Sequence, residues 1–345
     1  MSLSKPSLLE KGDTIGVVAP SSGFSAFVPH RLQNASEYLR NEGYKIKLFP
    51  TATSSKGHSS DTAKNRAKDI NEAFNDDEIK AIICNIGGYT ANQTLKYLDF
   101  STIKDNPKIF CGYSDISVLH YALHTQSNLM TFYGPCIMTQ FAEQPKPLPY
   151  TIDYFNKAVC SSKPVGKIKP SDKWTDEILD WMQRLDLERS RKMIKNNGYE
   201  WLRQGKAEGI LMGGCLPSIM HLKGTKFWPN HKNAIMFLDI PESHDFTKGE
   251  PVSEVDSLLT DLDLYGTLSQ IKGLIVGRPT HYSAEEVTEL KKILLENTVT
   301  YNIPILYGAD IGHTDPILTL PLGVRALIDS HSNSFELSES GVTSS

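Results

Sequence analysis

The 345-residue chain lacks the features that mark several protein classes. No stretch approaches about 18 apolar residues, which excludes a membrane-spanning helix, and the first residues hold no apolar run typical of a signal peptide. P-loop, HExxH and GxGxxG patterns are missing, and no Cys or His cluster has metal-ligand spacing. The net charge of −4 argues against a protein that coats nucleic acid or anionic membrane. We therefore expect no metal, no cofactor, and no nucleic-acid or membrane partner.

Cysteine is scarce, and its pattern is not that of a disulfide framework. The five cysteines are an odd number and form no CxxC pair. Most stand in apolar or glycine-rich runs, which is typical of buried free thiols. Free thiols persist in reducing compartments, so a cytoplasmic protein is predicted. The cysteines are Cys84, Cys111, Cys136, Cys160 and Cys215.

The composition is that of a globular protein. Hydrophobic residues make up 39% of the chain and charged residues 22%, which excludes a disordered or fibrous chain. At about 150 residues per domain, the length corresponds to one large or two ordinary domains. A chain of this size can bury a sufficient core without metals or disulfides.

Residues 1–160 predict an N-terminal α/β domain. Short apolar runs are interpreted as strands, and stripes of helical spacing lie between them, with Gly43 placed to end the first helix. Strands separated by helices indicate βαβ units and a mostly parallel, Rossmann-like sheet. The predicted strands are Thr14–Pro20, Lys45–Phe49, Ile79–Ile86 and Lys108–Gly112.

The rest of the chain divides into two parts. Residues 161–208 are polar, dense in Lys, Arg and Trp, and poor in buried-strand signals, so we predict a linker and substrate loop. Residues 209–345 predict a smaller, β-rich C-terminal domain. Its expected elements are strands at Ala234–Asp239 and Lys272–Gly277, short strands within Ile317–Leu337, and a helix with the capping box Ser283 and Glu286.

The sharpest local pattern is KIFCGYSDISVLHYAL, residues 108–123, where an apolar strand runs into a turn and then a helix-like stretch. Ligands gather at the carboxyl ends of strands in α/β sheets. A serine on a tight strand-to-helix turn exposes its hydroxyl, so Ser114 is a candidate nucleophile. The pattern is not GxSxG, and a helix N-cap serine is the alternative interpretation.

Two glycine-rich turns hold further candidates. Gly87 and Gly88 follow a strand in NIGGYTAN, where backbone N–H groups can approach a ligand, although a plain turn fits equally well. His313, in GADIGHTDPILTLPLG, is either a catalytic base or a structural histidine. Asp239 and Glu242, in MFLDIPES, are upstream acids for which a helix cap or a surface charge is the alternative.

In their order along the chain, several blocks together resemble the LD-carboxypeptidase family, the S66 serine peptidases. The resemblance covers roughly residues 10–330. It implies an α/β domain, a β-rich C-terminal domain, a Ser–Glu–His triad between them, and a cytoplasmic homodimer. The blocks are TIGVVAPSS, IGGYTANQTLKYLDF, CGYSDISVL, FYGP, GILMGGCLPSIMHLKGT, MFLDIPE and GADIGHTDPILTLPLG.

The resemblance implies a role for each matched position. Ser114 becomes the nucleophile and His313 the general base, and the N–H groups of Gly88 and Asp115 become oxyanion donors. Each such donor is typically worth about 3–4 kcal/mol of barrier.

Two positions depart from the family pattern. The glutamate of the triad aligns with Asp239, which is one methylene shorter, so either Asp239 or the nearby Glu242 orients His313; we favour Asp239. Cys215 stands where the GG-x motif usually has Asn, and its default role is a small apolar filler.

The block that begins at Ile86 resembles the microcin C immunity branch, because the peptidoglycan-recycling branch usually carries Arg at that place. The immunity branch cleaves the amide between an acidic aminoacyl group and a nucleotide-like moiety, and an extended loop supplies a ring that stacks on adenine. Trp174 and Trp181 are the candidates for that ring, and Asn92 for a further substrate contact. The expected partner is a small molecule or a short peptide–nucleotide.

Two other functions stay open. One is a muramoyl-tetrapeptide LD-carboxypeptidase of peptidoglycan recycling. The other is a non-catalytic ligand-binding member of the fold, in which the departures at Asp239 and Cys215 mark lost activity. The loop arginines could contact phosphate or carboxylate, but we interpret them as solvated charges; they are Arg184, Arg189 and Arg191.

Overall fold

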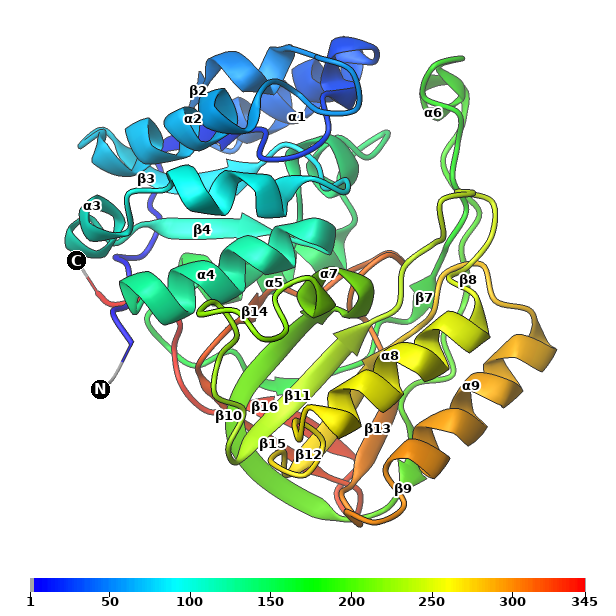
Figure 1. The fold of residues 1–345 in the computed structure, drawn as a ribbon. Coiled ribbons are helices and arrows are strands. Elements are labelled where there is room, and N and C mark those ends of the chain that lie inside the picture. Colours follow the sequence, from blue (N-terminus) through cyan, green and yellow to red (C-terminus); the bar gives the residue numbers. More distant parts are fainter. Residues whose placement is uncertain (1–2, 345) are drawn as a thin grey trace.

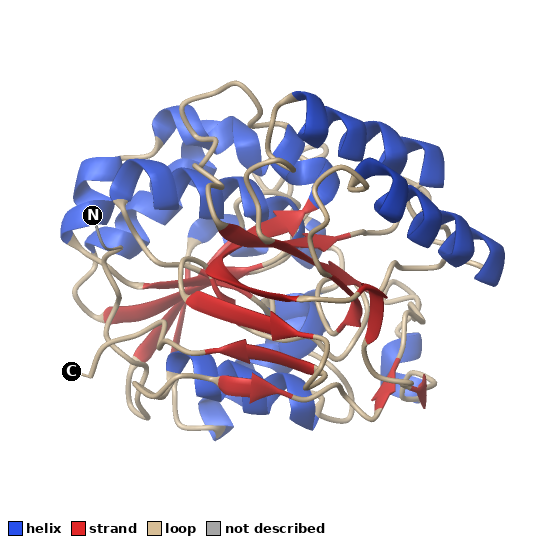
Figure 2. Cartoon of the chain, turned by 90° about the horizontal axis from the view of Figure 1, so that it is seen from below, coloured by secondary structure: helices blue, strands red, loops and turns tan. Residues whose placement is uncertain are grey.

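Two sheets organise the structure, a computed structural model that describes residues 3–344. Figure 1 shows the N-terminal elements, blue to cyan, stacked above the C-terminal elements, green to red. Figure 2, which views the chain from below, shows strands through the centre with helices on both sides. This arrangement confirms the predicted α/β fold with a second sheet-containing unit.

The first sheet has the order β14-β5-β4-β3-β1-β2, in which β14 alone pairs antiparallel. Its inner strands are apolar almost throughout because helices cover both faces of a parallel sheet. The strands are β1 (Thr14–Val18), β2 (Lys45–Leu48), β3 (Ile79–Cys84), β4 (Ile109–Gly112), β5 (Phe132–Tyr133) and β14 (Leu320–Pro321).

The helices around this sheet follow the predicted stripes. The first of them ends as predicted, since Gly43 adopts a positive φ of 100° and its N–H bonds to the Arg40 carbonyl at 3.0 Å. The α-helices are α1 (Pro29–Asn41), α2 (Ala63–Asn75), α3 (Phe100–Asp105), α4 (Ser117–Ser127) and α5 (Pro149–Val159). Short turns are η1 (Phe24–Ala26), η2 (Pro50–Thr53), η3 (Ala91–Tyr97), η4 (Ser114–Ile116) and the π-helical η5 (Ile137–Phe141).

The second sheet has the order β6-β16-β15-β10-β11-β12-β13-β9. Its centre, β10 to β13, is parallel, and antiparallel strands flank it on both sides. The strands are β6 (Gly166–Ile168), β9 (Glu200–Arg203), β10 (Lys206–Cys215), β11 (Ala234–Asp239), β12 (Gly273–Gly277), β13 (Ile305–Ala309), β15 (Arg325–Asp329) and β16 (Ser334–Leu337).

Helices α7 (Leu216–Met220), α8 (Val252–Leu264) and α9 (Ala284–Asn297) connect the parallel strands of this sheet. The C-terminal unit therefore contains α/β crossovers as well as the predicted short strands. The predicted capping box is present at α9, where the Ser283 hydroxyl accepts from the Glu286 N–H and the Glu286 carboxylate accepts from the Ser283 N–H.

Residues 161–208 contain more strand than their sequence indicates. Strands β6 and β9 form the two edges of the second sheet, and β10 begins at Lys206. Edge strands pair on one side only and need no continuous apolar run, which is why the pattern missed them. Between them, β7 (Lys173–Trp174), β8 (Ile194–Lys195) and α6 (Leu185–Glu188) form an extension visible in green in Figure 1.

One apolar cluster spans both sheets. It includes Phe110 from the first sheet, Leu238 from the second, and Leu119 and Ile219 from α4 and α7, which pack against each other. A shared core fixes the position of one sheet relative to the other, and with it the distance between residues at their strand ends.

Candidate active site

Ser114 lies two residues after β4, in a strained turn. Its φ of 65° lies in the left-handed region, which is unusual for a residue other than glycine and is common at functional sites. Gly87 makes the turn possible, because a Cβ there would lie 2.7 Å from the Ser114 Cβ. The hydroxyl does not cap a helix, the alternative interpretation, but lies 3.0 Å from the His313 Nε2.

His313 reaches Ser114 from the turn after β13. Its Nδ1 lies 2.8 Å from an Asp239 carboxylate oxygen, and its backbone N–H donates to the other oxygen at 3.3 Å. Gly312 has a φ of 90°, and any side chain at this position would collide with the Asp239 carboxylate. The GADIGH turn thus lets the shorter aspartate contact both the ring and the backbone of the histidine.

Asp239 ends β11 and is completely buried. It accepts a 2.5 Å hydrogen bond from the Tyr133 hydroxyl, and that hydroxyl in turn accepts the Ser114 N–H at 3.4 Å. Tyr133 therefore links the acid to the serine turn. Sequence reasoning noted FYGP as part of the resemblance but did not single out Tyr133.

Glu242 lies on the loop after β11, where it forms a backbone bridge with Gly249. Within residues 3–344, its carboxylate makes no hydrogen bond or ion pair, so Asp239 is the acid that contacts His313. Glu242 acts on the histidine through its charge alone.

The surrounding charges raise the pKa of His313 to about 9. Burial by itself lowers this pKa, but the nearby carboxylates outweigh it, first Asp239 and then Glu242 and Asp315. The Nε2 nitrogen can accept a proton only when the ring is neutral, so the geometry predicts a base that becomes more available as the pH rises.

The glycine-pair turn is held against Ser114 by the side chain of Asp115. That buried carboxylate accepts the Thr90 and Ala91 N–H groups at 3.0 and 3.1 Å and the Ser21 hydroxyl at 2.5 Å. Burial raises the pKa of Asp115, although these hydrogen bonds oppose the shift. Within residues 3–344, the Gly88 N–H has no hydrogen-bond acceptor, which leaves it available to a ligand.

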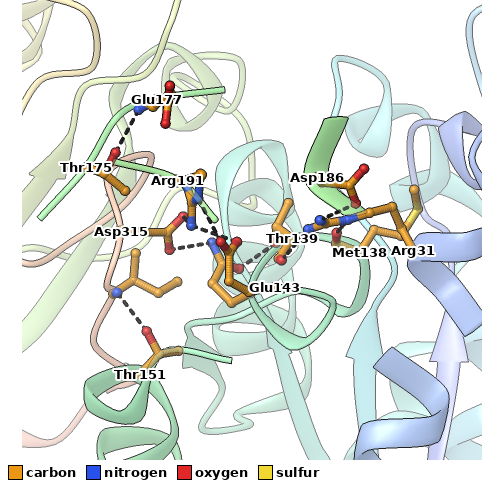
Figure 3. A network of polar contacts seen from close by, with 12 residues as sticks. Arg31, Met138, Thr139, Glu143, Thr151, Thr175, Glu177, Asp186, Arg191 and Asp315 are labelled. Atoms are coloured by element: carbon orange, nitrogen blue, oxygen red, sulfur yellow. Dashed lines mark hydrogen bonds and ion pairs between the residues drawn. The ribbon is translucent and has the colours of Figure 1, made fainter. Parts of the chain in front are cut away.

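The extension of residues 170–199, called the arm from here on, is fastened beside His313. Thr175 and Asp315 exchange backbone hydrogen bonds of 2.7 and 2.8 Å. Figure 3 shows Arg191 between two carboxylates, with ion pairs of 2.9 Å to Glu143 and 2.8 Å to Asp315. The interpretation of Arg191 as a solvated charge is therefore wrong, because it pairs with two carboxylates and the three side chains are only 10–15% exposed.

A second fastening lies at α6. Asp186 is buried and pairs with Arg31 of α1 at 2.9 Å, as the right side of Figure 3 shows. The Arg31 guanidinium also lies 4.2 Å from the centre of the Trp181 ring, and the Phe24 ring lies 6.1 Å from the indole between centroids. Trp181 therefore packs against residues of η1 and α1.

The other predicted substrate contacts are more dispersed. Trp174 lies in β7 with the Arg278 guanidinium 5.2 Å from its ring centre, one residue before the bridge to Asp315. Asn92 lies in η3, and within residues 3–344 its side chain has no hydrogen-bond partner. Trp201, which is not among the predicted substrate contacts, lies in β9 and donates to Asn333 at 2.8 Å.

The five cysteines are free thiols, four of them buried, in line with the expectation from their pattern. Cys215 ends β10 beside Asp239, its register partner on β11. A surface hollow of about 410 Å³ near Cys160 is lined by Tyr38, Tyr44 and Phe155 and by none of the candidate catalytic residues. The candidate active site is therefore recognised from the contacts among Ser114, His313 and Asp239, and this hollow lies elsewhere.

Two family descriptions match the chain. They are the LD-carboxypeptidase N-terminal domain, over residues 15–134, and the LD-carboxypeptidase C-terminal domain, over residues 208–328. The chain belongs to the LD-carboxypeptidase (S66) family. Ser114 lies in the first matched segment, and Asp239 and His313 lie in the second. Membership in this family of peptidases supports a hydrolase.

Individual relatives span almost the whole chain. The Microcin C7 self-immunity protein MccF of Escherichia coli is 30% identical, over 96% of this chain and 94% of the relative. A Bacillus subtilis protein named "Probable murein peptide carboxypeptidase" is also 30% identical, over 94% of this chain and 91% of the relative. A solved structure of MccF in complex with aspartyl sulfamoyl adenosine superposes with a TM-score of 0.88 at 29% identity, covering 99% and 100% of the two chains.

These matches confirm the family resemblance and the fold. Equal identity to an immunity protein and to a murein carboxypeptidase leaves the choice between the two activities to the chemistry of the site. Within residues 3–344, no helix has both the length and the apolar character needed to cross a bilayer.

Proposed function

We propose that this S66 family member is a serine amidase that cleaves the amide between an acidic aminoacyl group and a nucleotide-like moiety. The observation that carries the catalytic part is the chain of contacts from the Ser114 hydroxyl through His313 to the Asp239 carboxylate, with distances of 3.0 and 2.8 Å. A serine is a weak nucleophile unless an adjacent base takes its proton, and the base in turn needs an orienting partner.

In the proposed reaction, the Ser114 oxygen attacks the amide carbonyl carbon while its proton moves to His313 Nε2. Breakdown of the tetrahedral intermediate breaks the C–N bond, and the same proton passes to the leaving nitrogen. A water molecule then attacks the acyl-enzyme, again with His313 as the base, and releases the acid. Asp239 keeps the ring in place and stabilises the imidazolium formed in both halves of the reaction.

The developing oxyanion is assigned to the N–H groups of Gly88 and Asp115. Support comes from the Gly88 N–H, which has no acceptor within residues 3–344, and from the close approach of the neighbouring Gly87 to Ser114. Donors that are fixed before the reaction need no reorganisation when charge develops, and each is worth about 3–4 kcal/mol. The side chain of Asp115 has a separate role, since it holds the turn that carries Gly88.

The choice of a nucleotide-like leaving group rests on the arm and on the relatives. MccF has been solved with aspartyl sulfamoyl adenosine and with glutamyl sulfamoyl guanosine. In this chain the arm carries two tryptophans: Trp181, whose ring lies against the Arg31 guanidinium, and Trp174, which precedes the bridge from Thr175 to Asp315. We assign Trp181 or Trp174 to the base of the leaving group and Asn92 to a further polar contact.

A substrate panel tests this proposal. The full chain should cleave aspartyl sulfamoyl adenosine with a higher kcat/KM than a muramoyl tetrapeptide ending in D-alanine, and Ser114→Ala should cleave neither. Preference for the tetrapeptide would assign the chain to murein recycling instead. Binding of both compounds without turnover by the unmodified chain would show a non-catalytic binding protein.

Cytoplasmic residence and a homodimer also remain proposals. The free cysteines favour a reducing compartment. Sedimentation of the purified chain checks the dimer, which predicts twice the 38.4 kDa monomer mass.

A further inference from the structure

Cys215 places a thiol next to the catalytic acid and base. One ligand atom each of Cys215, Asp239 and His313 lies within 4.8 Å of the other two. The three residues come from the end of β10, the end of β11 and the turn after β13, so they converge although they are far apart in sequence. For this reason no metal-ligand spacing is visible in the chain.

These three residues offer the donor set that zinc prefers. Thiolate sulfur, imidazole nitrogen and carboxylate oxygen are its usual ligands, and three protein ligands leave a fourth position for water or substrate. Hard cations such as Mg²⁺ and Ca²⁺ select all-oxygen sites and are disfavoured here. The donor types therefore select a thiophilic divalent cation.

The surroundings hold the three donors in fixed positions. Cys215 is tied to α4 by a 3.0 Å hydrogen bond from its N–H to the Ser117 hydroxyl. Asp239 is fixed by Tyr133, and His313 by its backbone bond to Asp239. Ordered partners around a ligand set lower the cost of arranging it around an ion. Cys215 and Asp239 are buried, and an ion would reach them past Ser114 and His313, which are only partly buried.

We propose that Zn²⁺, or a cation of similar chemistry, binds to Cys215, Asp239 and His313 Nδ1 and switches the enzyme off. Binding releases the thiol proton and forms bonds from the metal to sulfur, nitrogen and oxygen, with no change of oxidation state. The metal occupies the nitrogen and the carboxylate that pair with each other in the metal-free site. His313 then no longer serves as a base for Ser114.

The inhibitory part of this proposal rests on the proposed amidase function, whereas metal binding can be measured without any substrate. Full-length, tag-free protein is titrated with Co²⁺ as a spectroscopic probe and with Zn²⁺ against a chromophoric chelator. One equivalent of metal should bind, and the Co²⁺ form should show a thiolate charge-transfer band in the near ultraviolet.

Cys215→Ser should abolish that band and weaken zinc binding by more than about 100-fold, since even the loss of a supporting contact costs about 10- to 100-fold. Cys160→Ser is the matched control, because this thiol lies outside the site and the variant should keep the band and the affinity. Cys215→Asn provides a second test if the serine variant is poorly folded. Unchanged affinity in both Cys215 variants would overturn the proposal.

Inhibition is read as the ratio of rates with and without zinc for each variant. Zinc should reduce turnover by the unmodified chain and by Cys160→Ser, with recovery on adding a chelator, and should have little effect on Cys215→Asn. A zinc-dependent increase in turnover would overturn the inhibitory role. If no substrate is cleaved but the Cys215-dependent band is present, the amidase proposal fails and the metal site stands.

Discussion

The catalytic centre and the arm are held in place by different means. Ser114, Asp239 and His313 follow or end central strands, and glycines at 87 and 312 allow their backbones to approach closely. The arm, residues 170–199, has little sheet pairing. Apart from the backbone bonds between Thr175 and Asp315, it is fastened by the charge pairs of Arg191 and of Asp186.

Under the proposed function, this difference separates the groups that react from the groups that select the substrate. The ends of sheet strands hold the reacting side chains in position, so the proposed reaction depends on few side chains outside the site. The arm depends on individual side chains that can be replaced one at a time, and loops of this kind set specificity in many enzymes. The following predictions probe the two regions separately, from the largest expected effect to the smallest.

Replacing the acid of the catalytic centre should have the largest effect. Asp239→Asn should lower kcat by about 10⁴-fold, because an amide no longer stabilises the imidazolium or fixes its tautomer. Glu242→Gln is the matched control, since Glu242 makes no contact with His313, and it should change kcat by less than about tenfold. Steady-state kinetics of both variants decide between the two acids; the reverse order would assign Glu242 to the triad.

Removing the central charge of the arm should mainly reduce stability. Arg191→Met leaves Glu143 and Asp315 buried without a cation, which costs about 3–5 kcal/mol of unfolding free energy. Arg189→Met breaks a half-exposed pair with Glu177 and should cost about 0–1 kcal/mol. Denaturant unfolding measures both values, and equal losses would refute the distinction drawn between buried and exposed arm charges.

The pH dependence of the catalytic centre should follow His313. Because its pKa is about 9, kcat/KM should rise about tenfold per pH unit between pH 7 and pH 8 and level off above pH 9. Glu242→Gln removes one of the charges that raise this pKa, so it should move the midpoint to lower pH. A midpoint near 6.5 in the unmodified chain would contradict the charge environment described above.

The same shift affects stability in the opposite direction. The folded-state pKa lies above the unfolded value of about 6.5, so the folded protein binds the proton more tightly. The stabilisation is fully present below about pH 6.5 and is lost as the pH rises through about 9. Unfolding measured at pH 6 and pH 9.5 should show this decrease, and it should be smaller in His313→Ala.

The smallest effect is expected at the arm's aromatic surface. Trp181→Ala loses the contact with the Arg31 guanidinium, worth about 0.5–1 kcal/mol of stability. If the indole stacks on the leaving group, KM for aspartyl sulfamoyl adenosine should rise while kcat changes little. Trp201→Ala, on the far strand β9, is the control and should leave KM unchanged.

The parts of the molecule that the sequence predicted well are those with a local signal. The strand–turn–helix pattern around Ser114, the apolar strands of both sheets and the Ser283 capping box depend on neighbouring residues, so periodicity and spacing are sufficient to find them. The family resemblance added the pairing of Ser114 with His313, which lies far along the chain.

The remaining features depend on contacts between distant segments. Tyr133 on Asp239 and Arg191 between Glu143 and Asp315 have no local pattern, and a single charge in a polar stretch looks like any solvated side chain. Edge strands β6 and β9 pair on one side only and need no continuous apolar run, so periodicity does not reveal them.

The most direct test of the central claim is covalent labelling with a serine-reactive fluorophosphonate, followed by peptide mapping. A nucleophile activated by His313 and Asp239 should give one labelled site, Ser114, and the label should disappear in Ser114→Ala and fall strongly in His313→Ala. Labelling that persists in Ser114→Ala, or that is unaffected by the loss of His313, would contradict the proposed mechanism.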